Sequence, residues 1–213
     1  TTNFNVDPYY DDYDETKNFH RILYKPGFAV QARELTQMQT IGQKQIQRFG
    51  DNVYQEGTII DGCEGQYDRK VAFVKLRDND PGGNTISVAA FANGIVTGLT
   101  SNVRAQVIAT AAGSEAGDPD LNTIFVKYLN SGRSNTDKTF RVNETISFKP
   151  EDGGNGEQAN TVSDGFGFGT LFSVNDGIVY GKGNFVRVEP QTVVLSKYDT
   201  TPSQRVSFNI EGK

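Results

Sequence analysis

VQARELTQMQTIGQKQIQRF, residues 30–49, is the stretch with the clearest helical pattern in the chain. Pro26-Gly27 interrupts the chain before it, and Gly50-Asp51-Asn52 resembles a C-terminal glycine cap after it. Six glutamines occupy much of this segment, and glutamine is a good helix former whose amide both donates and accepts hydrogen bonds. The apolar residues recur mostly three apart and therefore predict one narrow stripe along the helix: Ala32, Leu35, Met38, Ile41, Ile46 and Phe49.

Two arrangements would bury this stripe. The helix could pack on the β-rich part of its own chain, or it could face copies of itself around an axis while glutamines bond between chains. A narrow stripe suits a helical seam better than a broad core face. We therefore expect a dimer or trimer whose seam contains Leu35, Met38, Ile41, Ile46 and Phe49.

The first 28 residues predict an extended arm. Residues 7–15 combine three tyrosines with five acids, and Asp7 precedes a proline, which favours extended backbone. The arm could be merely solvated, could dock on a basic partner, or could bind calcium, although its carboxylates lack the regular spacing of a calcium loop. Because a solvated arm has no need of aromatic rings, we expect Tyr9, Tyr10 and Tyr13 to anchor it on another surface.

After Gly57 the pattern changes to short strands separated by glycine-rich turns. Short strands with glycine-rich turns are typical of a small antiparallel barrel or sandwich. Asn175-Asp176-Gly177 contains the Asp-Gly pair that is common in hairpin turns. We expect strands at 71–76, 85–91, 104–109, 123–129, 145–148, 170–174, 177–180, 184–188, 192–195 and 205–210.

The sequence thus predicts an α+β fold with an extended arm, one long helix and a mainly antiparallel β region. Residues 1–57 hold the arm and the helix. Residues 58–150 form a β-rich module, with a small barrel at about 83–150. A glycine-rich break at 152–156 separates it from residues 151–213, a second β-rich segment that continues the first or packs on it.

Composition argues against several partners. The 213 residues carry a net charge of −5 and no basic stripe, which disfavours nucleic acid. No apolar run approaches the ~20 residues that cross a bilayer, and the first residues lack the pattern of a signal peptide. One cysteine excludes an intrachain disulfide and suits a reducing cytosol. We expect synthesis in the cytoplasm, with no membrane or nucleic-acid partner.

No constellation for catalysis, a cofactor or a metal emerges. His20 is the only histidine, and Cys63 has no neighbouring cation that would activate a thiol. Residues 78–80 resemble the start of a calcium loop but lack the distal glutamate, and residues 165–169 lack the helix that a phosphate loop needs. A hydrolase of cell-envelope polysaccharide would need a pair of carboxylates in a cleft, and no pair can be singled out.

Three stretches together resemble a known family. They are residues 19–37, residues 94–107 with 124–128, and residues 176–198 with Pro202. In this order they resemble the N-terminal domain of large virion structural proteins of contractile-tailed phages, especially phages that infect cyanobacteria. The most specific part is PGFAVQARELTQ, residues 26–37.

The resemblance implies a non-enzymatic structural protein of the virion, at the baseplate or at the attachment of a tail fibre, with other tail and baseplate proteins as neighbours. The family brings no catalytic residues. A rival expectation is a receptor- or carbohydrate-binding module of a tail fibre, with Tyr128, Asn130, Tyr180 and Asn184 as contributors.

Overall fold

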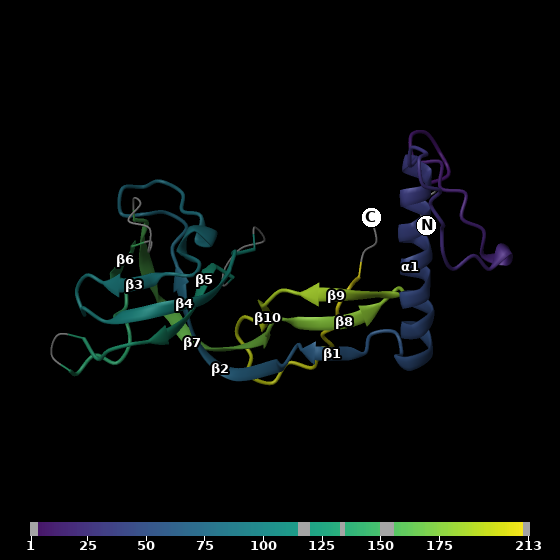
Figure 1. The fold of residues 1–213 in the computed structure, drawn as a ribbon. Helices are drawn as coiled ribbons and strands as arrows, with labels where there is room; N and C mark the ends of the chain where they lie inside the picture. Colours follow the sequence, from purple (N-terminus) through teal and green to yellow (C-terminus); the bar gives the residue numbers. More distant parts are fainter. Residues whose placement is uncertain (1–3, 115–119, 133–134, 150–155, 211–213) are drawn as a thin grey trace. The chain divides into compact units, whose positions relative to one another are not determined.

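The computed structural model describes residues 4–114, 120–132, 135–149 and 156–210. Its described residues contain one long helix and mainly antiparallel strands (Figure 1), which confirms the predicted α+β class. Contacts divide the chain into two compact units. Unit 1 comprises Thr1–Glu64, Asn175–Pro190 and Val206–Lys213, and unit 2 comprises Gly65–Val174 and Gln191–Arg205.

This division differs from the sequence-based one at 57/58 and 150/151. Strands from late in the chain pair with a strand that directly follows the helix, so unit 1 is assembled from separate segments. The expected boundary at 150/151 falls outside the described residues.

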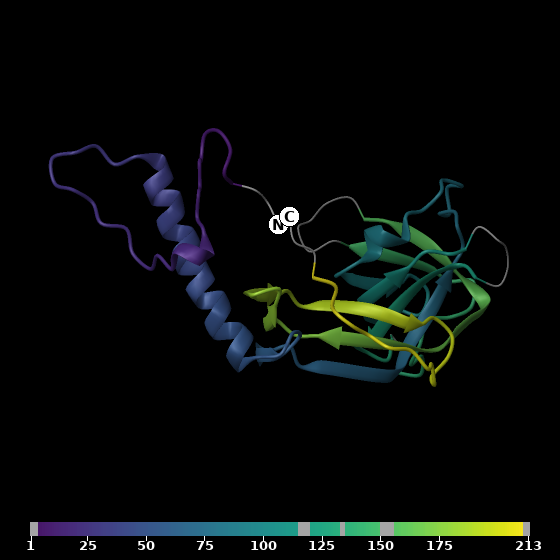
Figure 2. The ribbon, with the colours of Figure 1, turned by 90° about the vertical axis from the view of Figure 1, so that its right-hand side faces the viewer.

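In unit 1 the helix α1 spans Ala32–Val53. At its start the backbone N–H of Gln31 donates to a Glu34 carboxylate oxygen at 3.0 Å. The predicted glycine cap at Gly50 is absent, because Gly50 stays helical and the helix ends where the Tyr54 N–H donates to the Gly50 carbonyl. The residues before α1 form the arm, which runs back along the helix (Figure 2) and contains the short 3₁₀ turn η1, Glu15–Lys17.

A three-stranded antiparallel sheet completes unit 1, in the order β1 (Ile59–Gly62), β8 (Gly177–Gly181) and β9 (Asn184–Val188). Lys182 and Gly183 form the two-residue turn between β8 and β9, both with positive φ, as the twist of a tight hairpin requires.

Unit 2 contains a small barrel. Its six strands pair in a closed ring, β2-β5-β4-β3-β6-β7, because β6 pairs with both β3 and β7. A seventh strand, β10, extends the sheet along the C-terminal half of β7. The strand bounds are β2 Gly65–Leu76, β3 Ile95–Gly98, β4 Arg104–Ala111, β5 Asn122–Tyr128, β6 Thr145–Lys149, β7 Gln158–Val174 and β10 Gln191–Ser196.

Two strands of the barrel, β2 and β5, carry buried side chains on both of their faces. Val74 and Ile124 point into the main core with the 3₁₀ turn η2, Val88–Phe91, while Phe73 and Phe125 belong to a second cluster on the opposite face. Alternate side chains of a strand point to opposite faces, so β2 and β5 serve both clusters. Two predicted strands are wrong: 85–91 contains η2, and 205–210 has no ladder.

Candidate interaction surface

The helix α1 leaves an apolar face open to solvent. Leu35, Met38, Ile46 and Phe49 are 48%, 46%, 54% and 64% exposed, and Val53, beyond the predicted end of the helix, is 55% exposed. Gly42 lies on the same face, and a Cβ atom added there would meet none of the described residues within 4 Å, although Gly42 also lines a recess beside the arm. We call this face the helix stripe, which comprises Leu35, Met38, Gly42, Ile46, Phe49 and Val53.

Ile41, the fifth residue predicted for the seam, lies elsewhere. It is 5% exposed and lines a recess beside the arm, together with His20, Ile22 and Met38. The arm of the same chain therefore helps to bury the Ile41 side chain. The structure leaves Leu35, Ile46 and Phe49 on the open face, whereas Ile41 lies in the recess. Met38 lies at the edge between the two, because it is 46% exposed, lines the recess and accepts a contact from the Tyr24 hydroxyl of the arm at 3.6 Å.

The acids of the arm contact the polar side of α1. Asp11, which is 8% exposed, bonds through its carboxylate to the Thr40 hydroxyl, and Gln37 donates to Asp12 at 3.1 Å. Glu15 forms an ion pair with Arg48, which holds the pKa of Glu15 below its usual value. Among the described residues no group of three or more His, Cys, Asp or Glu side chains could hold a metal ion.

The tyrosines of the arm remain largely uncovered. Tyr9 and Tyr10 are 50% and 52% exposed; Tyr9 packs edge-on against Phe4, and the Tyr10 hydroxyl donates to Asp7. Tyr13 is half-buried. Sequence reasoning missed the second half of the arm, where Leu23 and Phe28 are 80% and 67% exposed. The sequence does contain a sign of this surface, because Leu23 and Phe28 are apolar residues on either side of Pro26-Gly27 and lie outside any predicted helix or strand.

Tyr180 joins α1 to the three-stranded sheet of unit 1. Its ring fills the space where a side chain on Gly50 would lie, and its hydroxyl donates to Asp51 at 2.5 Å. Desolvation, followed by the Asp51 carboxylate, raises the pKa of Tyr180 to about 12. Because Tyr180 is 1% exposed, it offers no free face to a glycan.

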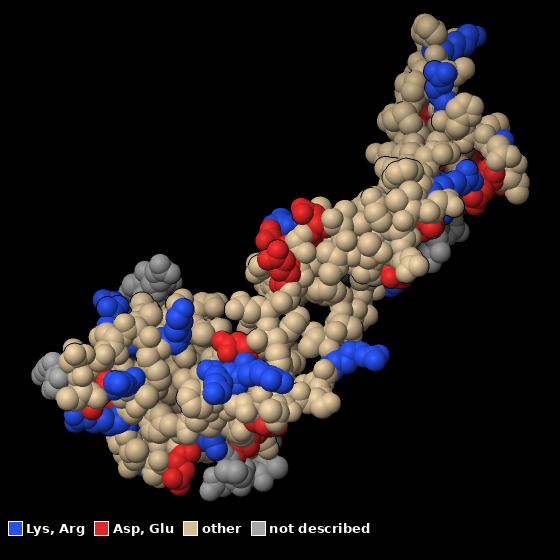
Figure 3. Space-filling view, turned by 90° about the horizontal axis from the view of Figure 1, so that it is seen from below, with Lys and Arg blue, Asp and Glu red and all other residues tan. Residues whose placement is uncertain are grey.

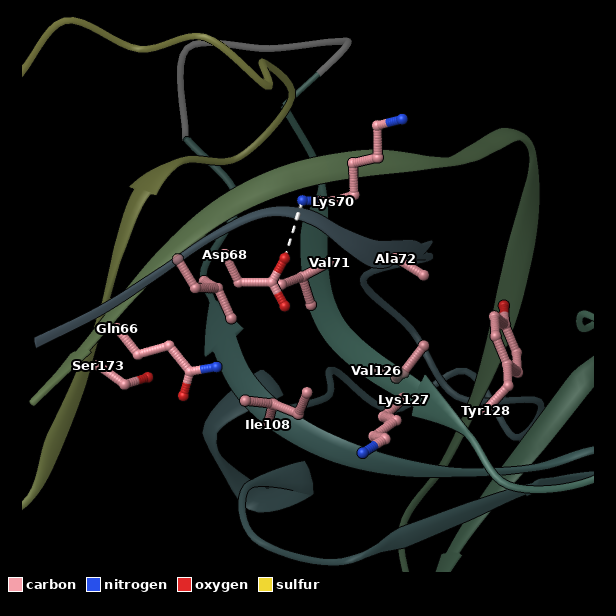
Figure 4. A pocket seen from close by; sticks show the side chains of 11 residues that line it. Gln66, Asp68, Lys70, Val71, Ala72, Ile108, Val126, Lys127, Tyr128 and Ser173 are labelled. Carbon is pink, nitrogen blue, oxygen red and sulfur yellow. Dashed lines mark hydrogen bonds between the residues drawn. The ribbon is translucent and has the colours of Figure 1, made fainter. Parts of the chain in front are cut away.

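A pocket of about 400 Å³ lies in unit 2 beside β2 (Figure 4). Val71 and Leu171 are among its lining residues, and Asp68, which also lines it, accepts a hydrogen bond from the backbone N–H of Lys70 (Figure 4). Tyr128 also lines it, and burial raises the pKa of that phenol to about 12.

The other residues proposed for glycan binding do not line this pocket. Asn130 accepts a hydrogen bond from the Arg104 backbone, and Asn184 donates to the Lys182 carbonyl in the β8–β9 turn. The structure therefore does not gather the four predicted glycan-binding residues in this pocket.

Among the described residues of unit 2, one carboxylate is buried in the interior. Glu144 is 3% exposed and accepts hydrogen bonds from the backbone N–H groups of Thr100, Ser101 and Arg141 and from the Ser101 hydroxyl. These donors are the polar partners that a buried carboxylate requires. The Glu144 carboxylate thereby links the turn at Thr100 and Ser101 to the segment at Arg141.

Charges on unit 2 are mixed. On the face that Figure 3 shows, Lys and Arg side chains are interspersed with Asp and Glu. No helix in the described part of the chain is long and apolar enough to cross a membrane.

Comparison with known proteins identifies the family of the chain. Neither the curated proteins nor the solved structures include a significant match. The model of a protein family described as a domain of unknown function, DUF4815, matches residues 7–118, which is more than half of the chain and covers the arm, α1 and the strands up to β4. The chain therefore belongs to the DUF4815 family.

Proposed function

We propose that this chain is a non-enzymatic structural component of a tailed-phage virion, where it holds neighbouring subunits at the baseplate or at the attachment of a tail fibre. The observation that carries the proposal is the helix stripe, whose five apolar side chains are about half exposed on a single helix. Three stretches of the sequence resemble virion proteins of contractile-tailed phages in the same order, and this resemblance supports a place in the tail.

The energetics favour a covered stripe. Burying the remaining half of such a side chain is worth about 1 kcal/mol, so five of them on one face make an effective contact. Soluble proteins rarely leave a continuous apolar patch on their surface unless another molecule covers it. The exposed Leu23 and Phe28 of the arm would add to the same kind of contact.

The test places acids on the stripe. In phage particles that carry this chain, Leu35→Asp combined with Ile46→Asp should abolish incorporation, because each carboxylate would have to be buried without a partner. The measurement is the amount of the chain in purified particles, by immunoblot or mass spectrometry.

A matched control makes the same chemical change elsewhere. Leu99 and Leu129 of unit 2 are 58% and 48% exposed, so Leu99→Asp with Leu129→Asp should leave incorporation unchanged. Circular dichroism must show that both variants fold. Normal incorporation of the folded stripe variant would refute the proposed function of α1.

A further inference from the structure

We infer that the helix stripe binds a second copy of this chain, and that the two α1 helices pair antiparallel around a twofold axis at Gly42. The inference deepens the proposed function and rests on it, because it names the neighbour that the stripe holds. It commits to a dimer and to one relative direction of the helices.

The spacing of the stripe is symmetric about Gly42. Met38 and Ile46 lie four residues before and after it, and Leu35 and Phe49 lie seven residues before and after it. In an antiparallel pair with its axis at Gly42, Met38 of one copy therefore faces Ile46 of the other, and Leu35 faces Phe49. A twofold interface is self-complementary in this way, because each contact occurs twice.

The stripe also runs straight along the helix. Its steps of three and four residues average the 3.6 residues of an ideal turn, whereas a long coiled coil needs a strict seven-residue repeat. A straight stripe favours two helices that cross at one point of closest approach. Gly42, in the middle, is the position at which two backbones can approach most closely.

The two glycines of α1 differ in what surrounds them. A Cβ atom on Gly50 would lie 2.4 Å from the Tyr180 ring, so Gly50 makes room for a side chain of its own unit. A Cβ atom on Gly42 would meet nothing within 4 Å among the described residues. Gly42 lines the recess beside His20 and Ile22 of the arm, but these residues leave open the space that its Cβ would occupy. Glycine weakens the interior of an exposed helix, so the open space at Gly42 is better explained by the approach of a second chain than by packing of the arm.

The charge distribution on α1 selects a second copy over a charged partner. Helical periodicity places Arg33, Lys44, Arg48 and Asp51 away from the stripe, and Arg48 is paired with Glu15 of the arm. Glu34 is the one charged residue of α1 that borders the stripe, and its carboxylate accepts a hydrogen bond from the Gln31 N–H at the start of the helix. The stripe is flanked by Gln31, Gln39 and Gln45. Identical charged faces would repel each other, whereas amide side chains both donate and accept and so complement their own copies.

Disulfide cross-linking of the full chain tests the direction and the register. Under mild oxidation, the double variant Met38→Cys with Ile46→Cys should form a covalent dimer, whereas neither single variant should. In a parallel pair each single variant would cross-link to itself. The wild-type chain, whose only cysteine, Cys63, is 5% exposed, measures the background.

Gly42→Leu tests the point of closest approach. It should weaken the dimer by about tenfold to a hundredfold, because the added side chain separates the helices, although it improves helix propensity within each chain. Gln43→Leu, which adds the same side chain beside the stripe, should leave the dimer intact. The mass in solution is measured by light scattering coupled to size exclusion.

The outcomes separate this inference from the proposed function. A wild-type monomer at high micromolar concentration, or cross-linking of the single variants, would overturn the antiparallel pair. If such a chain still required the stripe for incorporation into particles, α1 would bind a different virion protein and the proposed function would stand. Normal incorporation of a folded dimer-deficient Leu35→Asp, Ile46→Asp variant would remove the proposed function and leave the dimer as a property in solution.

Discussion

At the scale of single residues, Glu144 explains part of the stability of unit 2. Its two carboxylate oxygens accept four hydrogen bonds at 2.5–3.0 Å, which connect the β3–β4 turn around Ser101 to the segment before β6. Gly98 is required beside it, because a Cβ atom there would lie 2.6 Å from a Glu144 oxygen. The Glu144 carboxylate thus holds two segments of the barrel together.

Glu144→Gln should destabilise the chain by about 3 kcal/mol, because the amide N–H₂ would face backbone donors that have no other acceptor in the interior. The free energy of unfolding, from urea titration followed by circular dichroism, measures the loss. The exposed Glu157→Gln should change it by less than about 0.5 kcal/mol. Equal effects of the two substitutions would contradict the structural role of Glu144.

The raised pKa of Tyr180 predicts that unit 1 loses stability at alkaline pH. Its pKa is about 12 in the folded chain against 10.0 for an unperturbed phenol, so the unfolded chain binds fewer protons between these pH values. Stability should therefore fall as the pH rises from 10 towards 12. Tyr180→Phe should flatten this slope for unit 1, as measured by urea titration at each pH. An unchanged slope would place the pH dependence in other groups, such as Tyr128 of unit 2.

At the scale of elements, the helix and the short strands could be predicted because their signals are local. Apolar periodicity marked α1, and glycine turns marked most strands of the barrel. The end of α1 could not be placed correctly, because Gly50 serves packing against Tyr180, a residue far away in the sequence. For the same reason Val53 was missed as a member of the helix stripe.

Strand β7 shows where local patterns fail. The predicted strand begins at residue 170, yet Gly165, Gly167 and Gly169 already lie in a strand of seventeen residues. A Cβ atom on Gly167 would lie 2.8 Å from the Phe73 ring, and one on Gly169 would lie 2.7 Å from Phe125. Gly167 is needed because a ring of the adjacent strand β2 passes close to the backbone, and Gly169 because the Lys197 carbonyl and the Phe125 ring do. Only the tertiary packing reveals this need.

The two units also could not be predicted from local signals. The Asp-Gly turn at 176–177 suggested a hairpin, but β7 and β8 do not pair with each other and belong to different units. The chain leaves unit 1 after Glu64, builds the barrel and returns at Asn175. Pairing of β1 with β8 therefore depends on residues more than a hundred positions apart, beyond the range of any local pattern.

At the scale of the whole molecule, the two units differ in how much apolar surface they bury. Among the described residues of unit 2, two core clusters contain nineteen buried apolar side chains in all. Unit 1 buries four among its described residues, which are Ile41, Cys63, Val179 and Tyr180. Because burial of apolar surface is the main favourable contribution to folding, unit 1 should be the less stable of the two.

This contrast predicts the thermal behaviour of the chain. Calorimetry should resolve two transitions, and the midpoint of the lower one should rise with protein concentration, because pairing of α1 stabilises only folded unit 1. The upper transition, from unit 2, should not move. In Gly42→Leu the lower midpoint should become independent of concentration, while Gln43→Leu should behave as the wild type. A lower transition that ignores concentration in the wild type would mean that unit 1 gains its missing apolar contacts from a different protein, and that the stripe is filled only during assembly.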